Sequence, residues 1–201
     1  MTRMVPPYKV HAGSLLQHVS RTSYRSQALY YGAGGANRYD DPAGHYGVLY
    51  LGFDLATALM ESAFHKHKWA AGAKRSITLS EISSRLVRVA GVFVELHLAD
   101  MTAPNLMAAS FGLHLGQLVS RRYGHTQRIS ATIHAMQTVD GAPLFDGILY
   151  PSRNNFPATS IALFDRASAK VKLIDDIDLN EHREWPEFVR AFGIDILDDR
   201  Y

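Results

Sequence analysis

The stretch GVLYLGFDLATALMES, residues 47–62, decides the fold because it contains a buried strand and the start of a helix separated by one turn. Residues 48–51 are an apolar run bounded by glycines, which is typical of a buried strand. Asp54 is a suitable N-cap, and the following LATALMESAFHKHKW is rich in good helix formers. The pattern therefore predicts a strand, a turn, and a helix that reaches about Trp69.

The flanking segments predict an α+β domain. Residues 30–47, YYGAGGANRYDDPAGHYG, form a loop because the glycines permit positive φ and Asp-Pro marks a turn. Residues 85–98 are expected to form one or two strands, with a bend or strand break at Gly91. Further strands are expected at residues 147–152, 160–165 and 169–174. Residues 99–104 are expected to turn into a helix, and another helix is expected at 126–137. Short strands mixed with few helices indicate the α+β class.

The last residues, 181–201, form a helix-like tail. Its apolar side chains recur at helical spacing and are Trp185, Phe188, Val189 and Phe192. This stripe can pack on its own domain or on another chain, and packing on its own core is the favoured interpretation. No composition shift suggests a second domain, so we expect one domain over residues 1–201.

Composition excludes several classes of function. The chain has 21 basic and 19 acidic residues, a near balance that offers no global attraction for nucleic acid or an anionic membrane. It has no cysteine, which excludes disulfides and thiol nucleophiles. Residues 1–20 contain no secretory signal, and no apolar run is long enough to span a membrane. We therefore expect a cytoplasmic protein.

Three residues near the deciding stretch are candidates for a site. Arg38 lies in the glycine-rich loop, where a guanidinium can bind phosphate oxygens, although a solvated loop arginine is the commoner case. Glu61 lies in an otherwise apolar stretch and can line a cleft, although a solvent-facing glutamate is favoured on composition alone. Tyr50 can stack on a planar ligand or be a half-buried core tyrosine.

The remaining candidates give weaker signals. Ser152 follows Pro151 without a GxSxG context, so a hydrolase nucleophile is unsupported and a turn hydroxyl is the simpler interpretation. His65 and His67 stand two residues apart, on different faces of a helix, so they do not readily share an ion. No metal is expected.

Taken in order, these pieces resemble the RES-domain family. The fragments that carry the resemblance are HVSRTSYRS, ANRYD, GVLYLGFDLATALMES, VELHLADMT and DGILYPSRNN, and they cover roughly Arg21 to Asp175. The resemblance implies an ADP-ribosyltransferase-like fold, in which a split, twisted β core with surrounding helices holds NAD in a cleft.

The resemblance also implies a set of site residues, which are Arg21, Arg38, Tyr50, Glu61 and Ser152. The two arginines would hold the pyrophosphate of NAD, with Arg25 as the alternative to Arg21. Tyr50 would contact nicotinamide or its ribose, and Glu61 would stabilise positive charge on the ribose. Ser152 would bind the ribose or orient Glu61.

The function implied by the resemblance is that of a toxin that degrades NAD, by hydrolysis or by phosphorolysis with phosphate. One alternative is mono-ADP-ribosylation of a protein acceptor, and another is a noncatalytic binding module. The implied partner is an Xre-type antitoxin that covers the active site, with a homodimer within that complex. A nuclease-like toxin is disfavoured because the sequence lacks a basic aromatic patch.

Overall fold

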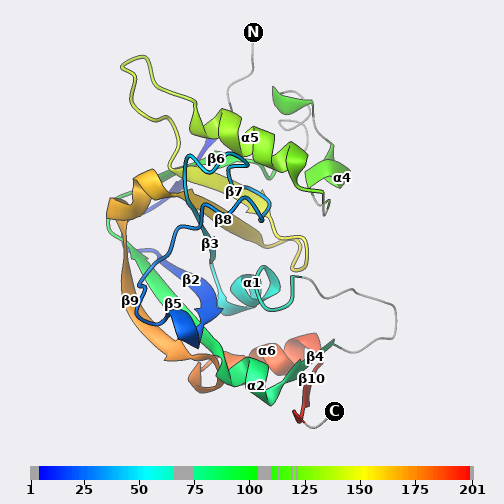
Figure 1. Ribbon diagram of the computed structural model, residues 1–201. Coiled ribbons are helices and arrows are strands. Elements are labelled where there is room, and N and C mark those ends of the chain that lie inside the picture. The colour runs from blue at the N-terminus through cyan, green and yellow to red at the C-terminus, as the bar shows by residue number, and fades with distance from the viewer. Residues whose placement is uncertain are drawn as a thin grey trace.

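An eight-stranded, curled sheet dominates the computed structural model, which describes residues 5–65, 75–103, 110–112, 114–118, 120 and 122–199 (Figure 1). In spatial order its strands are β1 (Pro7–Val10), β6 (Leu96–Asp100), β7 (Gly147–Pro151), β8 (Thr159–Phe164), β3 (Val48–Gly52), β2 (Leu15–Arg21), β5 (Arg85–Val92) and β9 (Val171–Asp178). Neighbouring strands are antiparallel except for β6 and β7, which are parallel.

Helices lie at the two ends of this sheet and between those ends. Figure 1 shows α5 (Gly124–His134) beside β6 and β7 at one end, and α6 (Trp185–Phe192) with α2 (Leu79–Ser83) at the other. Between them lies α1 (Leu55–Met60). The remaining elements are α4 (Leu115–Leu118), the 3-10 turns η1 (Thr22–Tyr24), η2 (Asp165–Lys170) and η3 (Leu179–Glu181), and a parallel pair of β4 (Arg75–Thr78) with β10 (Ile194–Leu197).

The sheet is split between β2 and β3. These two strands pair only through Gln17 and Gly52, whereas β2 pairs with β5 along its whole length. One residue beyond that single pair, Nδ1 of His18 lies 2.9 Å from the carbonyl oxygen of Tyr50, so a side chain bridges the strands where their backbone ladder has ended. The split core leaves room for side chains and for a ligand between the two halves of the sheet.

The fold confirms the α+β class and the predicted strand at residues 48–51. The side chain of Asp54 caps α1 by accepting a hydrogen bond from the backbone N of Thr57 at 2.6 Å. The predicted helix was too long, however, because α1 ends at Met60. There the chain turns and the backbone N of Phe64 donates to the carbonyl of Leu59, which buries the Phe64 ring in the core. Residues 66–69 of that prediction lie outside the described residues.

The other elements were predicted with small errors at their ends. The strands near residues 147–152, 160–165 and 169–174 and the helix near 126–137 are present as β7, β8, β9 and α5. Residues 85–98 form two strands, one of the two expected alternatives, but the break does not lie at Gly91. Gly91 lies within β5, which shifts register against β9 between Val89 and Ala90 and ends at Val92, before β6 begins. A Cβ at Gly91 would lie 2.8 Å from Ile174 Cγ1, so this glycine permits close packing rather than a bend. The turn into a helix expected at residues 99–104 does not begin at Ala99, because β6 continues to Asp100. Residues 104–109, where that helix would begin, lie outside the described part.

The C-terminal stripe packs on the chain's own core, as favoured from the sequence. Trp185 and Phe188 are buried in one apolar cluster with Leu55, Phe64 and other side chains. After α6 the chain turns through Gly193, whose φ of 57° is the left-handed conformation common at helix ends, and enters β10. Among the described helices none is long and apolar enough to cross a membrane.

Candidate functional site

A cavity of about 270 Å³ opens at the split between β2 and β3. Among the described residues that line it, Glu61 is the one carboxylate, whereas Arg38, Arg85 and Arg153 all contribute guanidinium groups. The rings of Tyr50 and Tyr150 line the same space. An excess of positive charge beside aromatic rings suits a ligand that is both anionic and planar.

Two donors fix the carboxylate of Glu61, which is the C-cap residue of α1. The hydroxyl of Ser152 donates to Glu61 Oε1 at 2.7 Å, and the backbone N of Arg153 donates to the same oxygen at 3.2 Å. Ser152 is itself buried, and its Oγ accepts a hydrogen bond from the backbone N of Asn155. The C-terminal end of a helix is an unfavourable place for a carboxylate, so these donors compensate for the position and orient the group.

Arg38 is buried beside this carboxylate, with 6% of its surface exposed. Its guanidinium carbon lies 5.7 Å from the centre of the Tyr150 ring, within the range of a cation–π contact. Burial works to lower the pKa of Arg38, but the combined influence of Tyr39, Tyr150, Glu61 and other neighbours outweighs it, so the pKa is raised. The cavity therefore holds a permanent positive charge.

The loop that carries Arg38 is anchored on both sides. From β3, the Tyr50 hydroxyl donates to Asp40 Oδ1 and accepts from the backbone N of Tyr39, both at 2.9 Å. From α5, Gln127 donates to the carbonyl of Gly35 at 2.8 Å, and a second side chain of the same helix, Ser130, binds the carbonyl of Tyr39. The Tyr50 hydroxyl is thus committed to the loop, and its ring is what lines the cavity.

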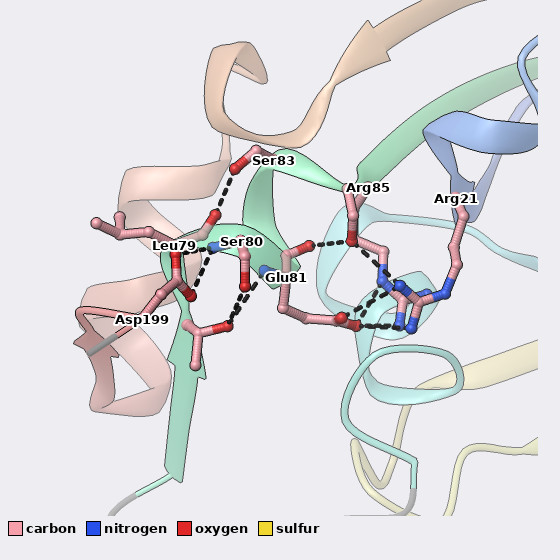
Figure 2. Close-up of polar contacts among 9 residues, drawn as sticks. Arg21, Leu79, Ser80, Glu81, Ser83, Arg85 and Asp199 are labelled. Carbon is pink, nitrogen blue, oxygen red and sulfur yellow. Dashed lines mark hydrogen bonds and ion pairs between the residues drawn. The ribbon is translucent and has the colours of Figure 1, made fainter. Parts of the chain in front are cut away.

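Arg21 does not line this cavity. Figure 2 shows its side chain beside that of Arg85, both directed at the carboxylate of Glu81. Arg21 Nη1 lies 3.3 Å from Glu81 Oε2 and also donates to the hydroxyl of Ser84. The alternative, Arg25, pairs with Asp176 and Asp178. The structure therefore brings together Arg38, Tyr50, Glu61 and Ser152 but leaves Arg21 at the edge, one strand from the lining residue Arg85.

His18 lines the cavity and has no counterpart in the sequence prediction. The carbonyl of Tyr50 can only accept, so Nδ1 of His18 must donate, and a neutral ring then carries its lone pair on Nε2. Burial, assisted by the charge of Arg88, lowers the pKa of His18 below its usual value of 6.5 despite the bond to Tyr50. The neutral ring offers the cavity an acceptor. The only hint in the sequence was its place in the fragment HVSR.

We expect a loss of stability in mild acid that depends in part on His18. Burial lowers the pKa of His18, and also of His134 and His182, so below about pH 6.5 the unfolded chain binds protons that the folded chain does not. The free energy of unfolding then falls as the pH falls, by at most about 1.4 kcal/mol per pH unit for each histidine. Urea unfolding between pH 5 and 8 measures this slope.

His18→Asn is the matched variant for that measurement, because the Asn amide can still donate toward the Tyr50 carbonyl but does not titrate. It should flatten the slope below pH 6.5. An unchanged slope would show that His18 titrates alike in the folded and unfolded chains.

No group of three potential ligands suited to a metal ion occurs among the described residues. His65 Nδ1 lies 2.5 Å from the carbonyl of Ser62 and so donates to the backbone. His67, the other member of the pair in the sequence, lies outside the described residues.

Comparison with protein-family models gives a match over most of the chain. The family model described as "RES domain" matches residues 15–186. A search of curated proteins finds none that matches. The matched segment runs from the start of β2 into α6 and contains His18, Arg38, Glu61 and Ser152.

Proposed function

This chain belongs to the RES-domain family, and we propose that it is a toxin that cleaves NAD at the bond between nicotinamide and ribose. The family is associated with toxin–antitoxin systems that act on NAD, and its fold is ADP-ribosyltransferase-like. The observation that carries the proposal is the carboxylate of Glu61, held by Ser152 in a cavity with buried Arg38.

The proposed reaction needs one carboxylate. When the bond between C1′ of the ribose and the nicotinamide nitrogen breaks, the electron pair goes to the nitrogen and a neutral molecule leaves, so no general acid is required. Positive charge develops on the ribose, where a fixed carboxylate in a shielded cavity stabilises it. Water then adds to C1′ and releases a proton, giving ADP-ribose. With inorganic phosphate the product is ADP-ribose phosphorylated at C1′.

Each residue of the cavity has a role in this proposal. Glu61 stabilises the charge on the ribose, and Ser152 orients Glu61. Arg38 binds the pyrophosphate, because it lines the cavity whereas Arg21 is paired with Glu81 at its edge. The ring of Tyr50 contacts the nicotinamide half while its hydroxyl holds the loop of Arg38.

Ser152→Ala should lower kcat/KM for NAD about 10- to 100-fold, because a hydrogen bond to a charged group contributes about 1.5–3 kcal/mol. The loss should fall mainly on kcat, since the carboxylate stays in place but is less well oriented. Steady-state release of nicotinamide measures both constants. Ser83→Ala removes a hydroxyl that, among the described residues, binds only the carbonyl of Leu79, so it serves as the control. Wild-type kinetics for Ser152→Ala would remove the positioning role.

Product analysis tests the proposed reaction and separates it from its alternatives. NAD labelled in both halves is incubated with the purified chain, with and without phosphate. Free nicotinamide with ADP-ribose indicates hydrolysis, and a phosphorylated ADP-ribose indicates phosphorolysis. Nicotinamide release only when a bacterial lysate supplies protein, with label attached to that protein, would indicate mono-ADP-ribosylation. Intact NAD in every condition would leave a noncatalytic binding module and refute the proposal.

The partner in this proposal is an Xre-type antitoxin in the cytoplasm that covers the cavity, within an assembly that contains a homodimer of the toxin. The apolar stripe of α6 is unsuited to that contact, because Trp185 and Phe188 are buried in the chain's own core. An antitoxin that covers the cavity should abolish NAD turnover when it is added to the purified toxin. Full turnover in a stoichiometric complex would contradict this arrangement.

A further inference from the structure

A second cavity, of about 430 Å³, adjoins the first and shares His18, Asn37 and Tyr50 with it. It contains neither Glu61 nor Ser152, so the proposed chemistry leaves it without a role. The first cavity alone, at about 270 Å³, is smaller than the roughly 300–1,000 Å³ usual for ligand pockets. A ligand of dinucleotide size must therefore extend beyond the first cavity, and the shared residues mark where it would cross.

The second cavity is lined by groups that suit a nucleoside. Tyr24 and Tyr30 present exposed aromatic rings, with 52% and 63% of their surface accessible. Nucleic-acid bases stack on such rings whatever their sequence. The hydroxyl of Ser20 lines the same cavity and has no hydrogen-bond partner in the part of the chain that the structure describes. Rings beside an unpaired hydroxyl fit a base with its ribose.

Arg88 holds this cavity in shape. It is 1% exposed, and its guanidinium donates to the backbone carbonyls of Tyr24, Gln27 and Ala28. These bonds tie the segment that carries Tyr24 to β5. Both terminal nitrogens of Arg88 bind the backbone, and its Nε lies 3.7 Å from Oδ2 of Asp176. Phosphate binding is therefore left to Arg38, which directly follows the shared residue Asn37.

We propose that the second cavity binds the adenylate half of NAD, with the adenine ring against Tyr24 and Tyr30 and the pyrophosphate at the junction beside Arg38. The proposal rests on the proposed function, which places the nicotinamide half at Glu61. It explains why the enzyme would select a dinucleotide, since nicotinamide mononucleotide carries the same scissile bond but cannot fill the second cavity.

The test compares NAD with nicotinamide mononucleotide as substrates. The wild-type chain should have the higher kcat/KM for NAD. The double variant Tyr24→Ala, Tyr30→Ala should lower kcat/KM for NAD about tenfold or more, the scale of base–aromatic stacking, and leave that for the mononucleotide unchanged. Replacing both tyrosines by Phe keeps the rings and should preserve NAD turnover. Tyr8→Ala removes an exposed ring outside both cavities and serves as the control.

An equal loss with both substrates, or no loss with NAD, would overturn the assignment. Calorimetric titration with ADP-ribose tests the subsite independently of the proposed reaction, because ADP-ribose can bind without any turnover. If the wild-type chain cleaves neither substrate, the proposed reaction is refuted. The role of the second cavity is then tested by the binding of ADP-ribose alone. Weaker binding by the double alanine variant would support the subsite, and unchanged or absent binding would refute it.

Discussion

Glu61→Gln should reduce kcat for NAD cleavage about 100- to 1000-fold, the usual cost of removing one electrostatic contact made to the transition state. The substitution keeps the shape of the side chain, and the amide oxygen can still accept from the Ser152 hydroxyl and the backbone N of Arg153. Only the negative charge is lost. KM should change little, because that charge acts on a ribose that becomes cationic during the reaction.

The control for this variant is Glu187→Gln, which removes an exposed carboxylate of α6 that pairs with Arg190 and with no other residue that the structure describes. It should leave kcat unchanged. Thermal unfolding of all three proteins shows whether the fold is intact. A folded Glu61→Gln protein with wild-type kcat would exclude charge stabilisation by Glu61.

Arg38→Met should lower kcat/KM for NAD about 10- to 100-fold, because charge-assisted hydrogen bonds to a phosphate oxygen contribute about 1.5–3 kcal/mol. The same variant should lose little stability. Arg38 is buried, and no carboxylate in the described part of the chain lies within ion-pair distance of it, but its neighbours together outweigh the cost of its desolvation. The apolar methionine avoids that desolvation cost and gives up those favourable contacts, so the two changes offset each other. Arg38→Lys should recover only part of the activity, since ammonium lacks the bidentate geometry of guanidinium.

Arg88→Met provides the contrast, because Arg88 is equally buried but its guanidinium binds three backbone carbonyls. Its removal takes one donor from each of these carbonyls, and among the described residues only that of Tyr24 keeps a backbone donor, the N of Gln27, so the melting temperature should fall clearly. Activity assays and thermal unfolding of the two variants test the difference. A loss of stability in Arg38→Met as large as in Arg88→Met would mean that Arg38 is a structural residue.

The sequence predicted the centre of the fold because its signals there are local. The strand at residues 48–51, the cap at Asp54 and the loop around Arg38 depend on neighbours in the chain, and each was found. The end of α1 was missed because it depends on Phe64, whose ring is drawn into a core formed by distant segments. Strands β1, β2 and β4 and helices α2 and α4 had no prediction, and the tail expected to be helix-like over residues 181–201 contains the strand β10 after α6.

The candidate site was predicted in part, for the same physical reason. The contact between Ser152 and Glu61 joins residues 91 positions apart, so the family resemblance suggested it while local patterns favoured a turn hydroxyl and a solvent-facing carboxylate. His18 was missed because its role follows from the split between β2 and β3, which no local pattern encodes. Arg21 belongs to one of the fragments that resemble the family, yet its guanidinium forms an ion pair with Glu81. The neighbouring Arg85 pairs with the same carboxylate.

The most direct test of the account is the release of free nicotinamide from NAD by the purified chain, measured beside Glu61→Gln under identical conditions. We expect nicotinamide to accumulate with the wild-type protein, in amounts equal to the NAD consumed, and the variant to release almost none. Intact NAD with the folded wild-type protein, with phosphate and with protein acceptors present, would contradict it. So would equal release by Glu61→Gln.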